Sequence, residues 1–182
     1  MKTNAVTGDI EHMNYDCRPI RQNYTAHAIV VLLFVFSGVS FALSGFMPPS
    51  GVLWQMLGLV LLLPAIQLIA RYMASRYLYR LHVYEDGRAD LEIFLYRGGD
   101  KMQMVCCVSL ADITAAAPLC ANNARAPKGV KRQDYAPDLH PLRALVLSVS
   151  HAESVYEVLF CPDEYLTRVI NDAIAARQTV QK

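Results

Sequence analysis

The feature that most constrains this chain is a long stretch without charge. No Lys, Arg, Asp or Glu occurs from Gln22 through Ala70, whereas residues 71–182 carry 14 basic and 13 acidic side chains. Of the 182 residues, 54% are hydrophobic and only 18% are charged, against roughly 25% charged in an average soluble domain. This apolar surplus exceeds what a soluble core requires, so a lipid environment is expected.

Two runs within this stretch are long enough to cross a bilayer. Residues 28–47 and 51–70 are uncharged, and a helix of about 20 residues covers the roughly 30 Å of hydrocarbon. A buried helix of a soluble protein is the alternative, but it predicts a polar stripe and a shorter run. Residues 48–50 are Pro-Pro-Ser, which forces the chain to stop and reverse. We therefore predict a two-helix transmembrane hairpin over residues 25–72.

Small side chains are concentrated in the second half of the first run. Such residues let helix backbones approach closely, so we expect them to pack the hairpin. Packing between copies of the chain is the alternative, and it would make the protein a homo-oligomer. The residues concerned are Ser37, Gly38, Ser40, Ala42, Ser44 and Gly45.

Arginines flank the outer ends of the hairpin, and its turn carries no charge. Basic residues near membrane spans favour the cytoplasmic side, so both termini are expected in the cytoplasm of a cell with a plasma (inner) membrane. Residues 1–24 then form a cytoplasmic tail. A cleaved signal peptide is the alternative, but its leader would begin with a long polar segment. The flanking arginines are Arg18, Arg21, Arg71, Arg76 and Arg80.

Residues 77–182 are expected to form a cytoplasmic domain of short strands and one helix. Turn residues separate runs in which apolar side chains alternate, which is typical of antiparallel hairpins. At the end, Pro162 suits a first helical position, and Leu166 and Ile170 lie on one apolar face. The predicted fold class is a membrane hairpin plus an α+β domain: a PH-like antiparallel open barrel capped by a C-terminal helix. The expected strands are residues 77–83, 91–95, 102–108, 113–117, 142–149 and 155–160.

Three segments carry a family resemblance: YLYRLHVYEDGRADLEIFLYRGGDKMQMVCCVSLADI, KRQDYAPDLHP and FCPDEYLTRVI. With the hairpin, their order resembles small bacterial two-transmembrane proteins of largely unassigned activity that have a C-terminal PH-like cytoplasmic domain. The resemblance covers residues 25–178 and implies a fold rather than a reaction. PH domains that bind phosphoinositides carry basic residues in the first hairpin loop. Here that loop has Glu85, Asp86 and Asp90 with only Arg88, which argues against inositol phosphate as a ligand.

Residues that commonly carry chemistry form no motif. The five cysteines contain no CxxC pair, and in a reducing cytoplasm they are interpreted as small buried hydrophobes. No His pair has the helical spacing of a metal site, and Gly98-Gly99 lacks the pattern of a phosphate loop. We predict no catalytic residue, no metal and no cofactor.

One segment suggests a contact surface. Residues 118–141 are long for a plain connection and contain Lys128, Lys131 and Arg132. A domain tethered below the bilayer meets anionic lipid, and each basic residue near that surface contributes about 1 kcal/mol. These three residues are therefore predicted to contact headgroups or a protein partner, and a solvated loop is the alternative.

The preferred function is a membrane-anchored, non-enzymatic adaptor that presents its domain at the cytoplasmic face. Its expected partners are membrane lipid and either a protein or anionic headgroups; a net charge of +1 argues against nucleic acid. An accessory or oligomeric subunit of a membrane complex or pore is the alternative. A membrane enzyme with an unrecognised site is the third.

Overall fold

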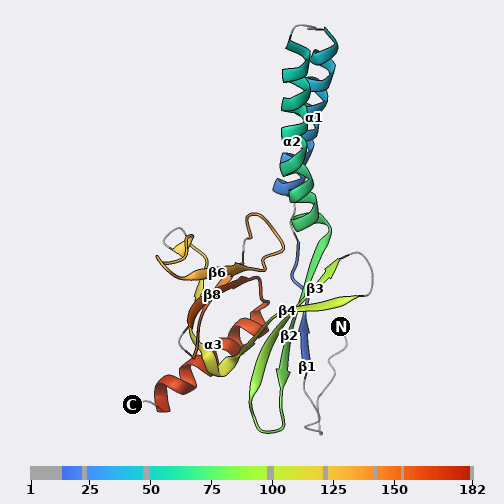
Figure 1. Cartoon of the computed structure of the whole chain (residues 1–182). Coiled ribbons are helices and arrows are strands. Elements are labelled where there is room, and N and C mark those ends of the chain that lie inside the picture. The colour runs from blue at the N-terminus through green and yellow to red at the C-terminus, as the bar shows by residue number, and fades with distance from the viewer. Residues whose placement is uncertain are drawn as a thin grey trace.

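The computed structural model describes residues 14–21, 24–46, 50–97, 101–120, 123–141, 143–152 and 154–180. Two long apolar helices project as a pair from a domain that contains two four-stranded sheets and a C-terminal helix (Figure 1). At this level the predicted α+β class and its order of elements are confirmed. The described strands form two open sheets, and neither is closed into a barrel.

The hairpin consists of α1 (Tyr24–Phe46) and α2 (Gly51–Leu68), and α2 runs into a π-helical turn, η2 (Ile69–Met73). Its two helices pack through small residues. The Ser37 hydroxyl donates to the carbonyl oxygen of Gly58 at 2.9 Å. A Cβ on Gly58 would lie 2.9 Å from the Phe41 ring, so a larger residue there would require the ring to shift.

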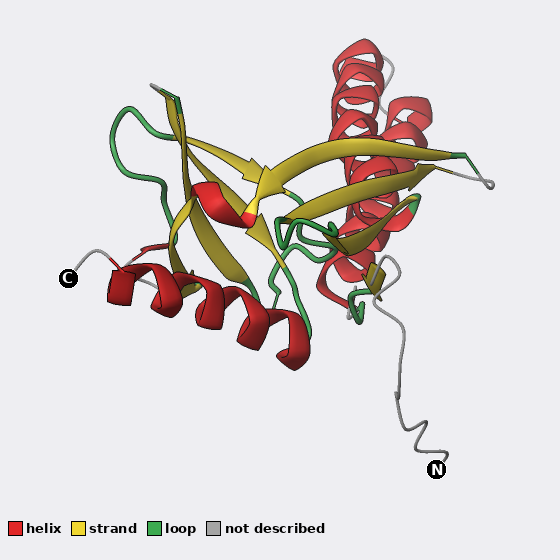
Figure 2. Cartoon of the chain, turned by 90° about the horizontal axis from the view of Figure 1, so that it is seen from below, coloured by secondary structure: helices red, strands yellow, loops and turns green. Residues whose placement is uncertain are grey.

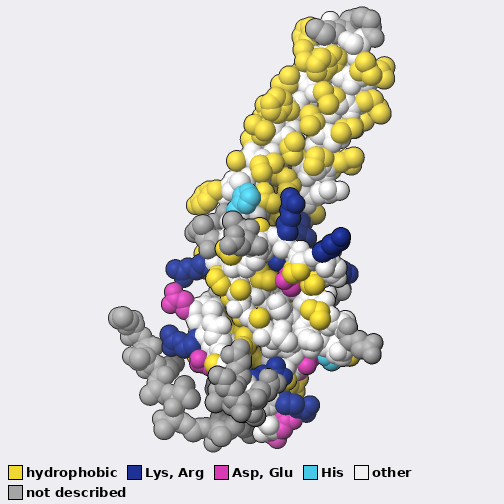
Figure 3. All heavy atoms as spheres, turned by 90° about the vertical axis from the view of Figure 1, so that its left-hand side faces the viewer, with side chains coloured by type: hydrophobic (Ala, Val, Ile, Leu, Met, Phe, Trp, Pro, Cys, Tyr) yellow, Lys and Arg dark blue, Asp and Glu magenta, His cyan; other side chains and the backbone are white. Residues whose placement is uncertain are grey.

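The rest of the hairpin surface is apolar and faces outward. Only 17% of the most apolar window of the first helix and 11% of that of the second are buried within the protein. Figure 3 shows hydrophobic side chains covering the visible face of the hairpin, with Lys and Arg side chains gathered below it. By length and composition, both helices can cross a membrane.

The first sheet has the order β1-β2-β3-β4 and is antiparallel throughout. The predicted three-strand meander is present as β2 to β4. Its first turn requires Gly87, whose φ is +79°, and the Asp86 carboxylate accepts the Arg88 N–H at 3.0 Å. The strands are β1 (Asn14–Cys17), β2 (Ser75–Val83), β3 (Ala89–Arg97) and β4 (Met102–Ser109).

Strand β1 precedes the hairpin in the chain, yet it pairs with β2, which follows the hairpin. Tyr15 lies opposite Leu81, and Cys17 lies opposite Tyr79. The helical hairpin is therefore inserted between two neighbouring strands of one sheet. The domain predicted from residue 77 onward therefore leaves out β1 and the start of β2. The β1 segment is short and shows no alternation that identifies it as a strand, so the sequence did not predict a strand there.

The second sheet has the order β5-β7-β8-β6. The predicted hairpin β7/β8 and the short strand β5 are present. Strand β6 lies inside the segment that the sequence suggested was a long loop, and it pairs in parallel with β8. Its polar sequence, KRQD, gave no strand signal. The strands are β5 (Ile113–Pro118), β6 (Lys131–Asp134), β7 (Leu145–His151) and β8 (Ser154–Phe160), and a 3-10 turn, η3 (Leu110–Asp112), precedes β5.

Helix α3 (Glu164–Val180) lies against the second sheet (Figure 2). The Asp163 carboxylate accepts the Leu166 N–H at 2.8 Å and so caps the helix; Pro162 lies before the cap rather than at the first helical position. Leu166 and Ile170 are fully buried in one core with residues of both sheets, as the apolar face predicted. Burial of each such side chain stabilises the fold by roughly 1.5–3 kcal/mol.

The insertion of the hairpin within the sheet gives the first prediction. The Arg21 guanidinium contacts the Ser75 carbonyl, so the two ends of the inserted segment meet. A chain in which a short Gly-Ser linker replaces residues 22–74 should be water-soluble, sheet-rich and cooperative in urea unfolding. Residues 77–182 alone should be less stable by about 3 kcal/mol or more, because the core loses Cys17 and its pairing. Equal stability of the two chains would show that β1 is not part of the folding unit.

Candidate functional site

The two apolar helices join the domain through a polar junction. The Arg21 guanidinium donates to the carbonyl oxygens of Tyr72, at 3.1 Å, and of Ser75. The Ser75 hydroxyl donates to the carbonyl of Ala70 at 2.8 Å. Carbonyls at a helix C-terminus lack intrahelical partners, and these bonds supply donors to those of Ala70 and Tyr72, while the bond to Ser75 ties Arg21 to the start of β2. Burial lowers the pKa of Arg21, and the positive charge of Arg76 lowers it further, so this cation lies in a partly dehydrated setting.

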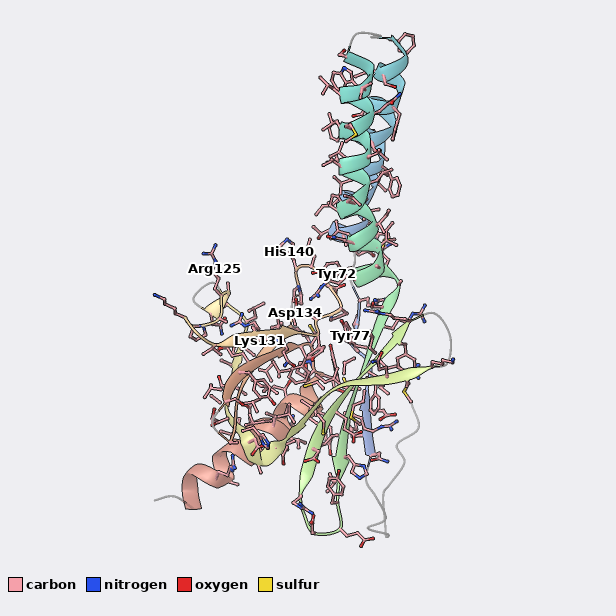
Figure 4. All side chains as sticks on the ribbon, in the orientation of Figure 1. Tyr72, Tyr77, Arg125, Lys131, Asp134 and His140 are labelled. Carbon is pink, nitrogen blue, oxygen red and sulfur yellow. The ribbon has the colours of Figure 1, made fainter. Side chains whose placement is uncertain are left out.

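A second arginine connects the end of the hairpin to the second sheet. Arg71, in η2, donates to Asp134 Oδ2 at 2.8 Å and to the Asp134 carbonyl at 3.3 Å. Its guanidinium also lies 5.4 Å from the centre of the Tyr72 ring. The pair is 46% and 37% exposed, so it contributes little stability, and its chief effect is to orient the hairpin on β6. Figure 4 shows Tyr72 and Asp134 close to this junction.

The structure separates the three predicted contact residues into two kinds. Lys128 lies in a turn and Lys131 begins β6, and both are exposed. Arg132 is instead paired with Glu157 at 2.7 Å, and the two side chains are only 11% and 10% exposed. Its remaining N–H groups donate to the carbonyls of Ala124 and Asn123 at 3.0 and 2.9 Å. Arg132 therefore holds the connection on the sheet.

A third exposed cation, Arg125, lies in the same connection, and sequence reasoning missed it. Arg125, Lys128 and Lys131 recur every third residue, and this spacing is the signal that identifies them as a group. We call these three residues the cationic turn. Figure 4 shows Arg125, Lys131 and His140 on the side of the domain from which the hairpin rises.

Tyrosines below the junction form a buried hydrogen-bond network. The Tyr135 hydroxyl donates to the Val105 carbonyl at 3.1 Å and contacts the Gln133 amide oxygen at 2.8 Å. The Tyr79 hydroxyl donates to the Tyr135 carbonyl at 2.9 Å. Burial raises the pKa of Tyr79 and Tyr135, so both phenols stay protonated and act as hydrogen-bond donors rather than as bases.

The interpretation of all five cysteines as buried hydrophobes is wrong: Cys17 is buried, Cys106 and Cys161 are half-buried, and Cys107 and Cys120 are exposed. The thiols of Cys17 and Cys161 are poor nucleophiles. Burial raises the pKa of Cys17 to about 11 and that of Cys161 to about 12. At neutral pH almost none of either thiol is ionised, and the thiolate is the reactive form. Within the part of the chain that the structure describes, no group of three His, Cys, Asp or Glu side chains could hold a metal.

A cleft of about 640 Å³ opens beside the segment that leads into α1. One wall is formed by residues 17–20, and the other by the connection before β7 together with the start of α3. The cleft contains two arginines, Arg18 and Arg143, and the buried carboxylate of Asp138. Arg143 also lies 3.1 Å from Glu164, and both side chains are exposed.

Comparison with known protein families, with curated proteins and with solved structures gives no match to this chain. Proposals about its function therefore depend on the geometry of the junction, the cationic turn and the cleft.

The structural role of Arg132 can be tested by breaking its ion pair. Arg132→Gln leaves the Glu157 carboxylate buried without its cation, and we expect a loss of about 3–5 kcal/mol in the free energy of unfolding. Lys128→Gln removes an exposed charge from the same connection and should change stability by less than about 0.5 kcal/mol. Chemical unfolding in detergent measures both. Similar effects of the two substitutions would contradict the assignment of Arg132 to the interior.

Proposed function

We propose that this protein is a membrane-anchored, non-enzymatic adaptor in the plasma (inner) membrane of a bacterial cell. Its hairpin crosses the bilayer twice, both termini lie in the cytoplasm, and a PH-like domain is held at the cytoplasmic face.

Membrane crossing is supported by the outward apolar surface of the hairpin. The two helical segments, Tyr24–Phe46 and Gly51–Met73, have 23 residues each, and their most apolar 18-residue windows have mean hydropathies of 2.4 and 2.1. The core helix of a soluble protein would be mostly buried, whereas most of this surface is not covered by the chain itself. In water that exposed area would drive aggregation, so lipid is its natural solvent.

The proposed orientation rests on the positions of the arginines. Arg18 and Arg21 precede α1, and Arg71 and Arg76 follow the apolar part of the second helix, so all four lie at the domain end. Basic residues are enriched on the cytoplasmic side of spans. The domain is then cytoplasmic, because it is attached at the same end.

The PH-like assignment rests on the order of elements. The β2–β4 meander, a second sheet and a C-terminal helix follow one another as in an open barrel capped by a helix. Two features depart from that outline: β1 comes from before the hairpin, and β6 runs parallel to β8.

The observation that carries the adaptor proposal is that exposed cations lie on the side of the domain from which the hairpin rises. Arg21 and Arg71 restrain the hairpin on the domain, and Figure 4 shows Arg125 and Lys131 on the side from which the hairpin rises. With the hairpin in a bilayer, this side of the domain would face the membrane surface. At about 1 kcal/mol each, three such residues would favour contact with an anionic leaflet by about 3 kcal/mol, roughly a hundredfold. The surface of the domain that faces away from the lipid is then presented to a protein partner.

The orientation can be measured by labelling intact cells with an impermeant maleimide. In Ser50→Cys the new thiol lies in the turn between the helices and should be labelled from outside. Native Cys120, an exposed residue of the domain, should be labelled only after the membrane is permeabilised. Peptide mapping locates the label. Labelling of Cys120 in intact cells would reverse the proposed topology.

Headgroup contact can be tested by hydrogen exchange on the full chain in nanodiscs. Amides of residues 123–131 should exchange at least threefold more slowly in discs with phosphatidylglycerol than with phosphatidylcholine, and 1 M salt should remove the difference. Arg125→Gln/Lys128→Gln/Lys131→Gln should abolish this lipid dependence. The matched control Arg88→Gln/Arg168→Gln removes exposed arginines elsewhere and should retain it. Lipid-independent exchange in the native chain would assign the turn to solvent or to a protein partner.

An oligomeric subunit is the second candidate, and one observation favours it. A Cβ added at Gly38 or Gly45 would meet none of the described atoms within 4 Å, so these two glycines of α1 lie away from the contact with α2. A helix from another copy could approach there closely. A defined homo-oligomer in detergent by light scattering, lost in Gly38→Leu, would favour this role over the adaptor.

A further inference from the structure

We propose that the end of the β3–β4 ribbon forms a second membrane contact, which binds the headgroups of an anionic leaflet on the side of the hairpin away from the cationic turn. This contact depends on the membrane anchoring proposed above and uses none of the residues of the cationic turn. We call its residues the ribbon surface: Arg76, Tyr96, Arg97, Lys101 and Met102.

The strand register places the ribbon surface at the base of the hairpin. Arg97 ends β3 and lies directly opposite Ser75, a residue of the polar junction. Arg76 follows Met73, the end of the second apolar helix, by three positions, so it lies at most about 11 Å along the chain from the proposed span. The row of side chains next to Ser75 and Arg97, across β2, β3 and β4, consists of Arg76, Tyr96 and Met102.

The ribbon and the cationic turn lie on opposite sides of the hairpin. In Figure 1, β6, which begins at Lys131, lies to the left of the hairpin, and the free ends of β3 and β4 lie to its right. Figure 2 keeps this order: the ends of β3 and β4 extend past the helices, away from the second sheet. A contact on one side alone would leave the domain free to tilt about the hairpin, whereas a contact on each side would hold it level against the leaflet.

The cations of the ribbon surface match the charge of an anionic leaflet. Arg76, Arg97 and Lys101 are exposed, and none of them forms an ion pair within the described part of the chain. Asp100 precedes Lys101 in the sequence and lies outside the described residues, so three cations less one anion leave an excess of two positive charges. The attraction of such a leaflet reaches about one Debye length, roughly 8–10 Å. The base of the hairpin lies within this range.

The proximity of Arg76 to Arg21 is a second observation that favours an outside anion. Burial, and then the positive charge of Arg76, lower the pKa of Arg21, so the two guanidinium groups lie close enough to repel each other. The Asp138 carboxylate acts in the opposite direction on Arg21. Arg76 has no such carboxylate among the described residues. A lipid phosphate beside Arg76 would reduce this repulsion.

Apolar side chains accompany these cations. Met102 is 45% exposed, and Tyr96, its partner on β3, is half-buried. Tyrosine is enriched at the boundary between headgroups and acyl chains, because its ring is apolar and its hydroxyl is polar. Met is flexible and adapts to an irregular apolar surface. Uncompensated cations next to these side chains fit a lipid surface better than an apolar protein surface.

The full chain in nanodiscs tests this contact. A spin label is attached to Met102→Cys in a Cys107→Ser/Cys120→Ser background, which removes the exposed native thiols, and its collision with a water-soluble nickel chelate is measured. We expect the collision rate to fall at least threefold in discs that contain phosphatidylglycerol, relative to phosphatidylcholine alone, and 1 M salt to restore it. A label on Arg88→Cys, in the exposed turn at the other end of β3, should not respond. Failure of the chain to enter the discs would contradict the proposed span itself.

Charge variants separate the ribbon surface from the cationic turn. Arg76→Gln/Arg97→Gln/Lys101→Gln should abolish the response of the label, and Arg97→Gln/Lys101→Gln decides the question if the triple variant does not fold. Neutralising the cationic turn with three Gln substitutions should leave at least about half of the response. A full response in the ribbon variant, or its loss in the cationic-turn variant, overturns the proposal. Equal shielding in both lipids, unaffected by salt, also overturns it and would assign this surface to a protein partner.

Discussion

The pairing of β1 with β2 is the constraint on which the rest of the structure depends. The chain leaves the first sheet at Cys17, forms the apolar hairpin and returns to the same sheet at Ser75. Both ends of the hairpin are therefore anchored in one sheet, and the Arg21 guanidinium bridges them through the Tyr72 and Ser75 carbonyls. A hairpin attached by one flexible linker would leave the domain free to turn, whereas this double attachment gives it one orientation.

The arginines of this protein have different roles because their surroundings differ. Arg21 satisfies carbonyls at a helix end, and Arg132 satisfies a buried carboxylate, so removing either would leave polar groups unpaired. Arg71 pairs with Asp134 in partial exposure and orients more than it stabilises. Arg125 is exposed. Burial and hydrogen-bond partners, rather than residue type, decide which of these side chains are available at the surface of the domain.

The phenols and thiols inside the domain are held in their neutral forms by burial. The phenols of Tyr79 and Tyr135 and the thiols of Cys17 and Cys161 have raised pKa values because they are buried, so at neutral pH they are neutral. The two phenols connect strands to one another and to the connection that carries the cationic turn. Charged groups of both signs gather instead in the cleft beside α1.

The sequence by itself determined the two apolar helices, the meander, the β7/β8 hairpin and the amphipathic α3, because each has a local pattern: a charge-free run, alternation with turn residues, or a helical apolar face. Only the tertiary structure decided that Asn14–Cys17 completes the sheet and that Lys131–Asp134 is a strand, since such short segments become strands through partners far away in the chain. It also separated Arg132 from Lys128 and Lys131. Their charges are alike in the sequence, and burial against Glu157, which depends on the position of β8, sets Arg132 apart.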